Sequence, residues 1–128
     1  MATPTELVTL FVDLWEQDDG FTEAVNTYFT DETVWENHGL LTTTGKEQAL
    51  GFYHEFSKAT GMTGMKIDML AIAETGNKVL THRIERIIDA KGTEVMTVPV
   101  MGIFEIDGGK ITAWRDYFDT IANSPPSE

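Results

Sequence analysis

Trp114, Asp116 and Phe118 alternate in an aromatic segment near the C-terminal end of the sequence. Because the side chains of a β-strand point alternately to its two faces, these three residues are expected to share one face. A carboxylate between two aromatic rings is costly to bury unless it is paired, and its pKa then depends strongly on its surroundings. Asp116 is therefore the first candidate for a catalytic carboxylate.

A second set of candidates comes from two earlier segments of the chain. Arg83 and Glu85 share a face of a long predicted strand, and Trp35 and Asn37 share a face of a shorter one. If these faces point to one cavity, the arginine can bond two carboxylates and leave one of them protonated, as acid and base on either side of a substrate. Asn37 could hold a water there. The set predicts activation of that water and protonation of a leaving oxygen.

Each of these residues also has an ordinary structural interpretation. By alternation alone, Arg83 and Glu85 more often form a surface ion pair. Asn37 can simply end a strand, and Trp35 can belong to the core. If the opposite face of the long strand pointed inward, Arg86 would be an awkward core residue, which mildly favours Arg83 and Glu85 as the inward pair.

Other kinds of active site find no support in the sequence. The chain has no cysteine, and its three histidines are scattered without a metal-ligand spacing. No serine lies in a nucleophile-elbow pattern, and the glycines at 61 and 64 lack the lysine that a phosphate-binding loop needs. Metal, nucleotide and acyl-enzyme chemistry are therefore unsupported.

Size and charge limit the class of protein. The chain has 128 residues, so we expect one domain over residues 1–128, ending in a tail at 119–128. A net charge of −12 argues against nucleic acid and anionic membranes as partners. No apolar run approaches the roughly 20 residues of a membrane span. The first residues lack the basic segment of a secretory signal, and we expect a cytoplasmic protein.

The spacing of apolar residues predicts the elements that carry these candidates. Helical spacing predicts helices over 5–17, 22–29 and 45–58, the first capped by Thr3 or Thr5. Between them we expect a turn at 30–32 and a loop at 39–44. A strongly curved sheet wrapped around the helices, with an internal pocket, is the α+β arrangement that this order favours. Alternation and turn residues predict strands over 33–38, 65–74, 79–90, 94–106 and 111–118.

The segments that hold the candidates resemble the limonene-1,2-epoxide hydrolase family of the SnoaL-like, NTF2-like superfamily. The most specific stretches are residues 102–106 and 109–119, and weaker matches lie at 81–85 and 28–37. The resemblance implies the NTF2-like cone, with a curved mixed sheet around N-terminal helices. It also implies a homodimer that hydrolyses an epoxide in one step, without a cofactor.

The resemblance assigns a role to each matching residue. Asp116 is the base that activates a water for direct attack on an epoxide carbon, and Arg83 bridges the two carboxylates. Asn37 helps to hold the water. Glu85 stands where the family has an aspartate as the acid, and Trp35 where it has a second water-holding residue, a tyrosine.

The last two positions keep other functions open. A glutamate places its carboxyl about 1.5 Å further along the side chain than an aspartate does. An indole N–H can donate a hydrogen bond but cannot accept one. The alternatives on this fold are a SnoaL-like or ketosteroid-isomerase-like enzyme, which moves a proton next to a carbonyl with one carboxylate, and a small-ligand binder without catalysis.

The expected pocket is apolar and suits a small hydrophobic substrate, such as a terpenoid, steroid or polyketide-like epoxide. By alternation, Arg115 should face away from the pocket and form a salt bridge on the outer face of the sheet or at a subunit contact. The residues expected to bind the substrate are Leu14, Trp15, Ile87, Val98, Val100, Trp114 and Phe118.

Overall fold

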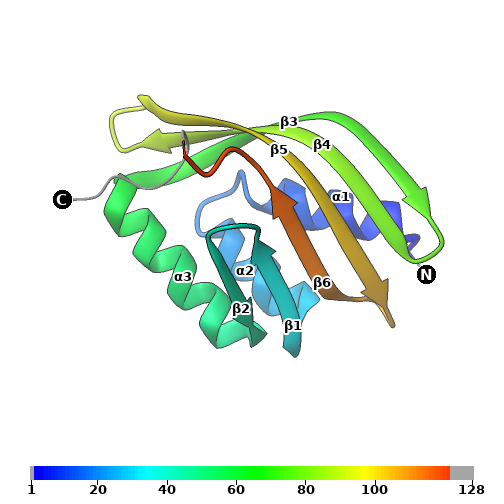
Figure 1. Cartoon of the computed structure of the whole chain (residues 1–128). Helices are drawn as coiled ribbons and strands as arrows, with labels where there is room; N and C mark the ends of the chain where they lie inside the picture. Colours follow the sequence, from blue (N-terminus) through cyan, green and yellow to red (C-terminus); the bar gives the residue numbers. More distant parts are fainter. Residues whose placement is uncertain (1, 122–128) are drawn as a thin grey trace.

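The computed structural model describes residues 2–121, which form three helices and six strands (Figure 1). Of the predicted tail, residues 119–121 follow the last strand and 122–128 lie outside the described residues. In chain order the elements are α1 (Pro4–Leu14), α2 (Gly20–Tyr28), β1 (Phe29–Asn37), β2 (Leu41–Thr44), α3 (Gly45–Thr60), β3 (Met62–Thr75), β4 (Lys78–Asp89), β5 (Glu94–Asp107) and β6 (Lys110–Tyr117).

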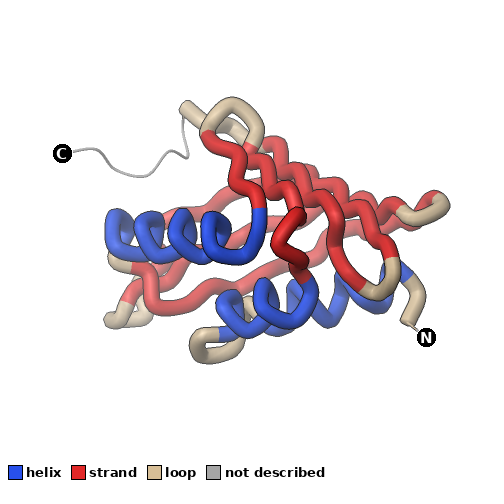
Figure 2. Tube along the Cα trace, turned by 90° about the horizontal axis from the view of Figure 1, so that it is seen from below, coloured by secondary structure: helices blue, strands red, loops and turns tan. Residues whose placement is uncertain are grey.

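All six strands form one mixed sheet in the order β2-β1-β6-β5-β4-β3. Neighbours from β3 to β6 are antiparallel, whereas β1 runs parallel to β6. The long strands β3, β4 and β5 bend over the helices, which lie on the inner side of the sheet (Figures 1 and 2). The predicted α+β fold with a curved mixed sheet around the helices is confirmed.

The core lies between α1 and the inner face of the sheet. Thr3 caps α1, because its hydroxyl accepts from the backbone N–H of Glu6 and the Glu6 carboxylate accepts from the backbone N–H of Thr3. Phe11 is fully buried on this helix, and its ring lies 5.4 Å from the rings of both Trp15 and Trp114. The aromatic core therefore extends directly to the segment that carries Asp116.

The N-terminal half of the sheet differs from the prediction. Residues 30–32 belong to β1 rather than to a turn, and the predicted loop at 39–44 contains β2, which pairs antiparallel with β1. β2 is a short edge strand of one leucine and three threonines in which only Thr43 is buried, so it lacks the apolar alternation that identifies a strand. In addition, α1 ends at Leu14 instead of residue 17, and β3 already begins at Met62.

Candidate active site

Neighbouring strands present the predicted residues on the inner face of the sheet. Thr81 of β4 pairs with Gly102 of β5, which pairs with Asp116 of β6. On the far side of β6, Asn37 of β1 pairs with Asp116. Residues paired in this way lie about 5 Å apart, because that is the spacing of neighbouring strands. Arg83 follows Thr81 on the same face of β4, so four strands contribute to one site.

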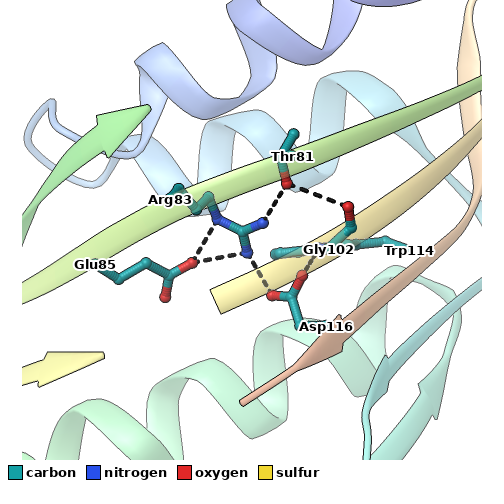
Figure 3. A network of polar contacts seen from close by, with 6 residues as sticks. All are labelled: Thr81, Arg83, Glu85, Gly102, Trp114 and Asp116. Atoms are coloured by element: carbon teal, nitrogen blue, oxygen red, sulfur yellow. Dashed lines mark hydrogen bonds and ion pairs between the residues drawn. The ribbon is translucent and has the colours of Figure 1, made fainter. Parts of the chain in front are cut away.

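The fully buried Arg83 bridges the two carboxylates (Figure 3). Its Nη2 donates to Asp116 Oδ2 at 2.5 Å, and its Nε donates to Glu85 Oε2 at 2.9 Å. Its Nη1 donates to the hydroxyl of Thr81 at 2.8 Å. The alternative of a surface ion pair is therefore wrong, because the sheet turns this face of β4 toward the helices.

Aromatic rings surround the guanidinium. The Cζ atom of Arg83 lies 5.4 Å from the ring centre of Trp15 and 5.9 Å from those of Phe104 and Trp114. At these distances a cation is attracted to the π-face of the ring, and the attraction is stronger where water is excluded. The arginine is thus held by its charge, its hydrogen bonds and the surrounding rings together.

Asp116 is 4% exposed, and both of its oxygens accept hydrogen bonds. Oδ1 accepts from the indole Nε1 of Trp114 at 2.7 Å, and Oδ2 accepts from Arg83. Burial raises the pKa of Asp116 from 3.8 to about 6, against the lowering effect of Arg83 and with a further increase from the charge of Glu85. A carboxylate with this pKa is a better proton acceptor near neutral pH than an ordinary aspartate.

A pocket of about 710 Å³, including its open mouth, lies in front of the two carboxylates. Its amide and carboxyl groups come from Asn37, Glu85 and Asp116, whereas Arg83 lies behind this wall. The other lining side chains are almost all apolar, which suits a hydrophobic molecule with a few polar atoms. The predicted residues that line it are Trp15, Trp35, Ile87, Val98, Val100, Trp114 and Phe118.

Leu14 does not line this pocket, contrary to the prediction. It is half-buried and packs against the hydrophobic core, because α1 ends there and the following residue, Trp15, is the one that reaches the pocket. The prediction also missed lining residues that come from α2, α3, β3, β5 and the residues after β1. Their place in the pocket depends on how the helices pack against the sheet, which spacing within one element does not specify. These residues are Phe21, Leu40, Phe52, Tyr53, Phe56, Met62, Met65 and Met96.

Trp35 lies in the pocket wall and stacks on Trp114, with ring centres 4.6 Å apart and planes 7° from parallel. Its Nε1 is buried and has no hydrogen-bond partner within residues 2–121. The indole bonded to Asp116 therefore belongs to Trp114. The signal for that bond was present in the sequence, because Trp114 and Asp116 are two residues apart on one strand face.

Thr81 is a neighbour of Arg83 in the candidate site that the sequence did not single out. Its hydroxyl accepts from Arg83 and donates to the backbone oxygen of Gly102 at 3.3 Å (Figure 3). It is 1% exposed and lies two residues before Arg83 on the same face of β4. That spacing was the available signal, although a buried threonine on a strand is too common to stand out.

The outer face of the sheet carries Arg115. Its Nη1 donates to Glu105 at 2.8 Å, and its Nε lies 3.6 Å from a carboxylate oxygen of Glu36. The predicted salt bridge of Arg115 on the outer face is confirmed. In the part of the chain that the structure describes, no group of three or more His, Cys, Asp or Glu side chains could hold a metal ion, and no helix is long and apolar enough to cross a membrane.

Comparison with known proteins points to one family. The family model of the limonene-1,2-epoxide hydrolase catalytic domain matches residues 2–123. The epoxide hydrolase EphG of Mycobacterium tuberculosis is 32% identical over 103 residues, which are 80% of this chain and 65% of that protein. The chain thus matches less than two thirds of that relative's length.

Solved structures agree with this family and its fold. The structure of an LEH-like epoxide hydrolase from M. tuberculosis is 28% identical, with a TM-score of 0.72 over 92% of this chain and 84% of that one. An NTF2-like protein of Cytophaga hutchinsonii has a TM-score of 0.73 at 18% identity, covering 95% of both chains. A Jannaschia protein named for its likeness to the polyketide cyclase SnoaL has a TM-score of 0.74 at 20% identity, over 96% of this chain and 93% of its own.

The fold is therefore NTF2-like, as predicted, and the family model covers nearly the whole chain. Of the two bridged carboxylates, Asp116 lies in the stretch of strongest sequence resemblance and Glu85 in one of the weaker stretches. This chain belongs to the limonene-1,2-epoxide hydrolase family.

Proposed function

We propose that this chain is an epoxide hydrolase that adds water to a small hydrophobic epoxide in one step, giving a diol. The observation that carries this proposal is the pair of carboxyl groups at the wall of an apolar pocket, joined by a buried arginine. One carboxyl group can accept a proton while the other donates one. Membership of the family and the name of the M. tuberculosis relative support the same reaction.

Asp116 acts as the base in this proposal. It takes a proton from a water held between its carboxylate and the amide of Asn37, its partner on the adjacent strand. The water oxygen attacks an epoxide carbon as this proton leaves. The raised pKa of Asp116, about 6, favours the transfer while leaving the group ionised at neutral pH.

Glu85 acts as the acid. As the new carbon–oxygen bond forms, the epoxide carbon–oxygen bond breaks and the released oxygen takes the proton of Glu85. After one turnover Asp116 has gained a proton and Glu85 has lost one. Both residues line the pocket, and the side chain of Glu85 is 19% exposed, so exchange with solvent through the mouth can reset both groups.

Arg83 makes the set of three charged groups neutral throughout this reaction. With one proton shared between two carboxyl groups and one guanidinium present, the set is neutral before and after the proton moves. Because Arg83 touches both carboxyl groups but does not line the pocket, it is a positioning residue rather than a group that meets the substrate. A preorganised neutral set avoids placing a net charge in a site with little water.

Trp35 is proposed to act through the wall of the pocket. Its ring stacks on Trp114, whose N–H holds Asp116, so it helps to orient the base. The rings and aliphatic side chains of the wall favour a terpenoid, steroid or polyketide-like epoxide. We propose substrate contacts for Trp15, Ile87, Val98, Val100, Trp114 and Phe118.

The proposal is tested by incubating the protein with limonene oxide, cyclohexene oxide and styrene oxide and measuring diol formation by chiral chromatography. In water labelled with ¹⁸O, one labelled oxygen should enter each diol in the first turnover, because no covalent intermediate with the enzyme forms. Asp116→Asn should abolish turnover. Absence of diol from every epoxide, or unchanged turnover in Asp116→Asn, would contradict the proposal.

A proton transfer next to a carbonyl, as in an isomerase or cyclase, is the second candidate. Two observations favour it. The pKa of Asp116 is raised to about 6, which suits a base near neutral pH. The water-holding tyrosine of the family is replaced by Trp35, whose N–H is buried. Such a reaction needs one carboxylate and no held water. Exchange of solvent deuterium into a ketone, without diol formation, would identify it, and ligand binding without either reaction would identify a binder.

The resemblance also leads us to propose a homodimer in the cytoplasm. Three large apolar side chains, Leu80, Met101 and Tyr117, are exposed on the adjacent strands β4, β5 and β6. A second copy could cover them. Light scattering coupled to size-exclusion chromatography should give twice the chain mass, and a monomer at micromolar concentration would exclude a stable dimer.

A further inference from the structure

We propose that Gly102 and Thr81 are positioning residues, which let the side chain of Arg83 cross one strand of the sheet and hold it there. This inference rests on the proposed function, because the crossing joins the proposed base to its arginine. The starting observation is topological. Arg83 lies on β4 and Asp116 on β6, and these strands are not neighbours, because β5 lies between them.

The bond between the two residues must therefore pass over the inner face of β5. Adjacent strands are about 4.8 Å apart, so β4 and β6 are separated by about 10 Å. In the cross-strand row at this height, Gly102 is the residue of β5 that lies between Thr81 and Asp116. Figure 3 shows the guanidinium and the carboxylate meeting over this glycine.

The space above Gly102 is filled by the site itself. A Cβ atom at this position would lie 2.5 Å from Nη1 of Arg83 and 3.2 Å from the hydroxyl of Thr81, and closer still to Oδ1 of Asp116. The contacts with Arg83 and Asp116 are shorter than non-bonded atoms allow. Any other residue at position 102 would therefore push the guanidinium, the carboxylate or both away from their present places.

Backbone conformation does not explain this glycine. Seven other glycines have positive φ angles, but Gly102 does not, so an L-residue could adopt its backbone. A glycine inside a strand weakens the strand, because it has no side chain to pack. The close approach of Arg83 and Asp116 is what gives the glycine a purpose here.

Thr81 fixes the other side of the crossing. Its hydroxyl accepts from Nη1 of Arg83 and donates to the backbone oxygen of Gly102, which ties the side chain on β4 to the main chain of β5. The other hydrogen-bond partners of the guanidinium, Asp116 and Glu85, are the proposed reacting carboxyl groups themselves. Thr81 is thus the neutral contact that orients Arg83 without taking part in proton transfer.

The first experiment compares Gly102→Ala with a matched control, Gly64→Ala. Gly64 also lies in a strand and has no positive φ angle, and a Cβ atom added to it would meet open space, with no neighbouring atom within 4 Å. A displacement of about 1 Å at a reacting group can cost roughly 100-fold in rate. We expect kcat of Gly102→Ala on an epoxide to fall about 100-fold with a much smaller change in KM, and Gly64→Ala to behave as the wild type.

The second readout needs no turnover. The carboxyl carbon of Asp116 is followed by ¹³C NMR as a function of pH, with Arg83 and Glu85 of β4 as the charged groups that face it and Tyr53 of α3 as the other titratable side chain in the pocket. Arg83 and Trp114 lower the pKa of Asp116, so weakening their bonds in Gly102→Ala should move its titration to higher pH. Gly64→Ala should leave it unchanged.

Thr81→Val and Thr81→Ser test the crossing if Gly102→Ala does not fold. Valine keeps the shape of threonine but removes the bond to a charged donor, and we expect kcat to fall roughly 10-fold with the pH profile shifted. Serine retains the hydroxyl and should restore most of the activity. If Thr81 had a purely structural role, the substitutions would lower the melting temperature, but Thr81→Val would not shift the pH profile of kcat.

The outcomes separate this inference from the proposed function. If the wild type forms diols but a folded Gly102→Ala or Thr81→Val keeps its kcat and its Asp116 titration, the positioning role is overturned and the hydrolase remains. If no epoxide reacts, yet the Asp116 titration moves in Gly102→Ala and not in Gly64→Ala, the crossing stands and the hydrolase falls.

Discussion

The two faces of the sheet carry the same set of charges in opposite surroundings. On the inner face Arg83 bridges Glu85 and Asp116, and on the outer face Arg115 lies between Glu36 and Glu105. Arg115 directly precedes Asp116 in the sequence. The side chain of Arg83 has no exposed surface, whereas that of Arg115 is 34% exposed.

This difference shows that burial, and not the choice of residues, gives the two sets different electrostatic properties. Water screens the charges around Arg115, and exposed pairs of this kind contribute roughly 0–1 kcal/mol. Around Arg83 the aromatic rings exclude water, so each charge depends on its partners and a carboxyl group can hold a proton near neutral pH. The same three groups therefore form an ordinary exposed ion-pair set on one face and the proposed acid–base set on the other.

Removing Arg83 is expected to have the largest effect. Arg83→Ala leaves two carboxyl groups without their shared cation, and loss of one partner of a buried ion pair typically costs about 3–5 kcal/mol. Diol formation should fall below detection, and the free energy of unfolding, from urea titration, should fall by an amount in this range. A stable and active Arg83→Ala protein would show that burial does not set the inner face apart from the outer one.

The pH dependence tests the base. Asp116 must be ionised to take the proton of water, and its pKa is raised to about 6. We expect kcat/KM to fall about tenfold per pH unit as the pH drops below 6. Stability depends on pH in the opposite direction to the rate. The folded protein holds this proton more tightly than the unfolded chain, so Asp116 contributes to the free energy of unfolding at low pH. That contribution is lost as the pH rises from about 4 to about 6.

The measurement compares urea unfolding of the wild type and Asp116→Asn at several pH values. The difference in stability between the two proteins should shift in favour of the variant as the pH rises through this window. A wild-type rate that is independent of pH between 5 and 7 would remove Asp116 as the base.

Substitutions at Glu85 test whether its carboxyl group donates the proton to the leaving oxygen. Glu85→Gln cannot donate an acidic proton to the leaving oxygen, and we expect kcat to fall roughly 100-fold. Glu85→Asp keeps the acid at a shorter reach and should retain more activity than Glu85→Gln. Equal activity in both variants, measured with the best epoxide of the panel, would mean that Glu85 is not the acid.

The smallest effect is expected on the outer face. Arg115→Gln removes the cation of the exposed set, and the free energy of unfolding should change by at most about 1 kcal/mol, less in high salt. The value of kcat should stay at the wild-type level. A large loss of activity in Arg115→Gln would mean that the outer face also supports the site, for instance through a subunit contact.

Much of the site could be predicted because it depends on alternation within single strands. Trp114, Asp116 and Phe118 share a face as expected, and so do Arg83 and Glu85. The errors came where local pattern is weak. The threonine-rich β2 has no apolar alternation, and the exclusion of Leu14 from the pocket depends on where α1 ends.

The sequence by itself determined which side chains share a strand face, because that follows from a two-residue period. The stretches 102–106 and 109–119, which lie on β5 and β6, indicated the family. Only the tertiary structure decided that the face of Arg83 is the buried one and that its side chain crosses β5 at Gly102. Both depend on how the sheet curves and on which strands are neighbours. Residues 83, 102 and 116 lie on three different strands and are far apart along the chain, so no local sequence pattern predicts that they contact one another.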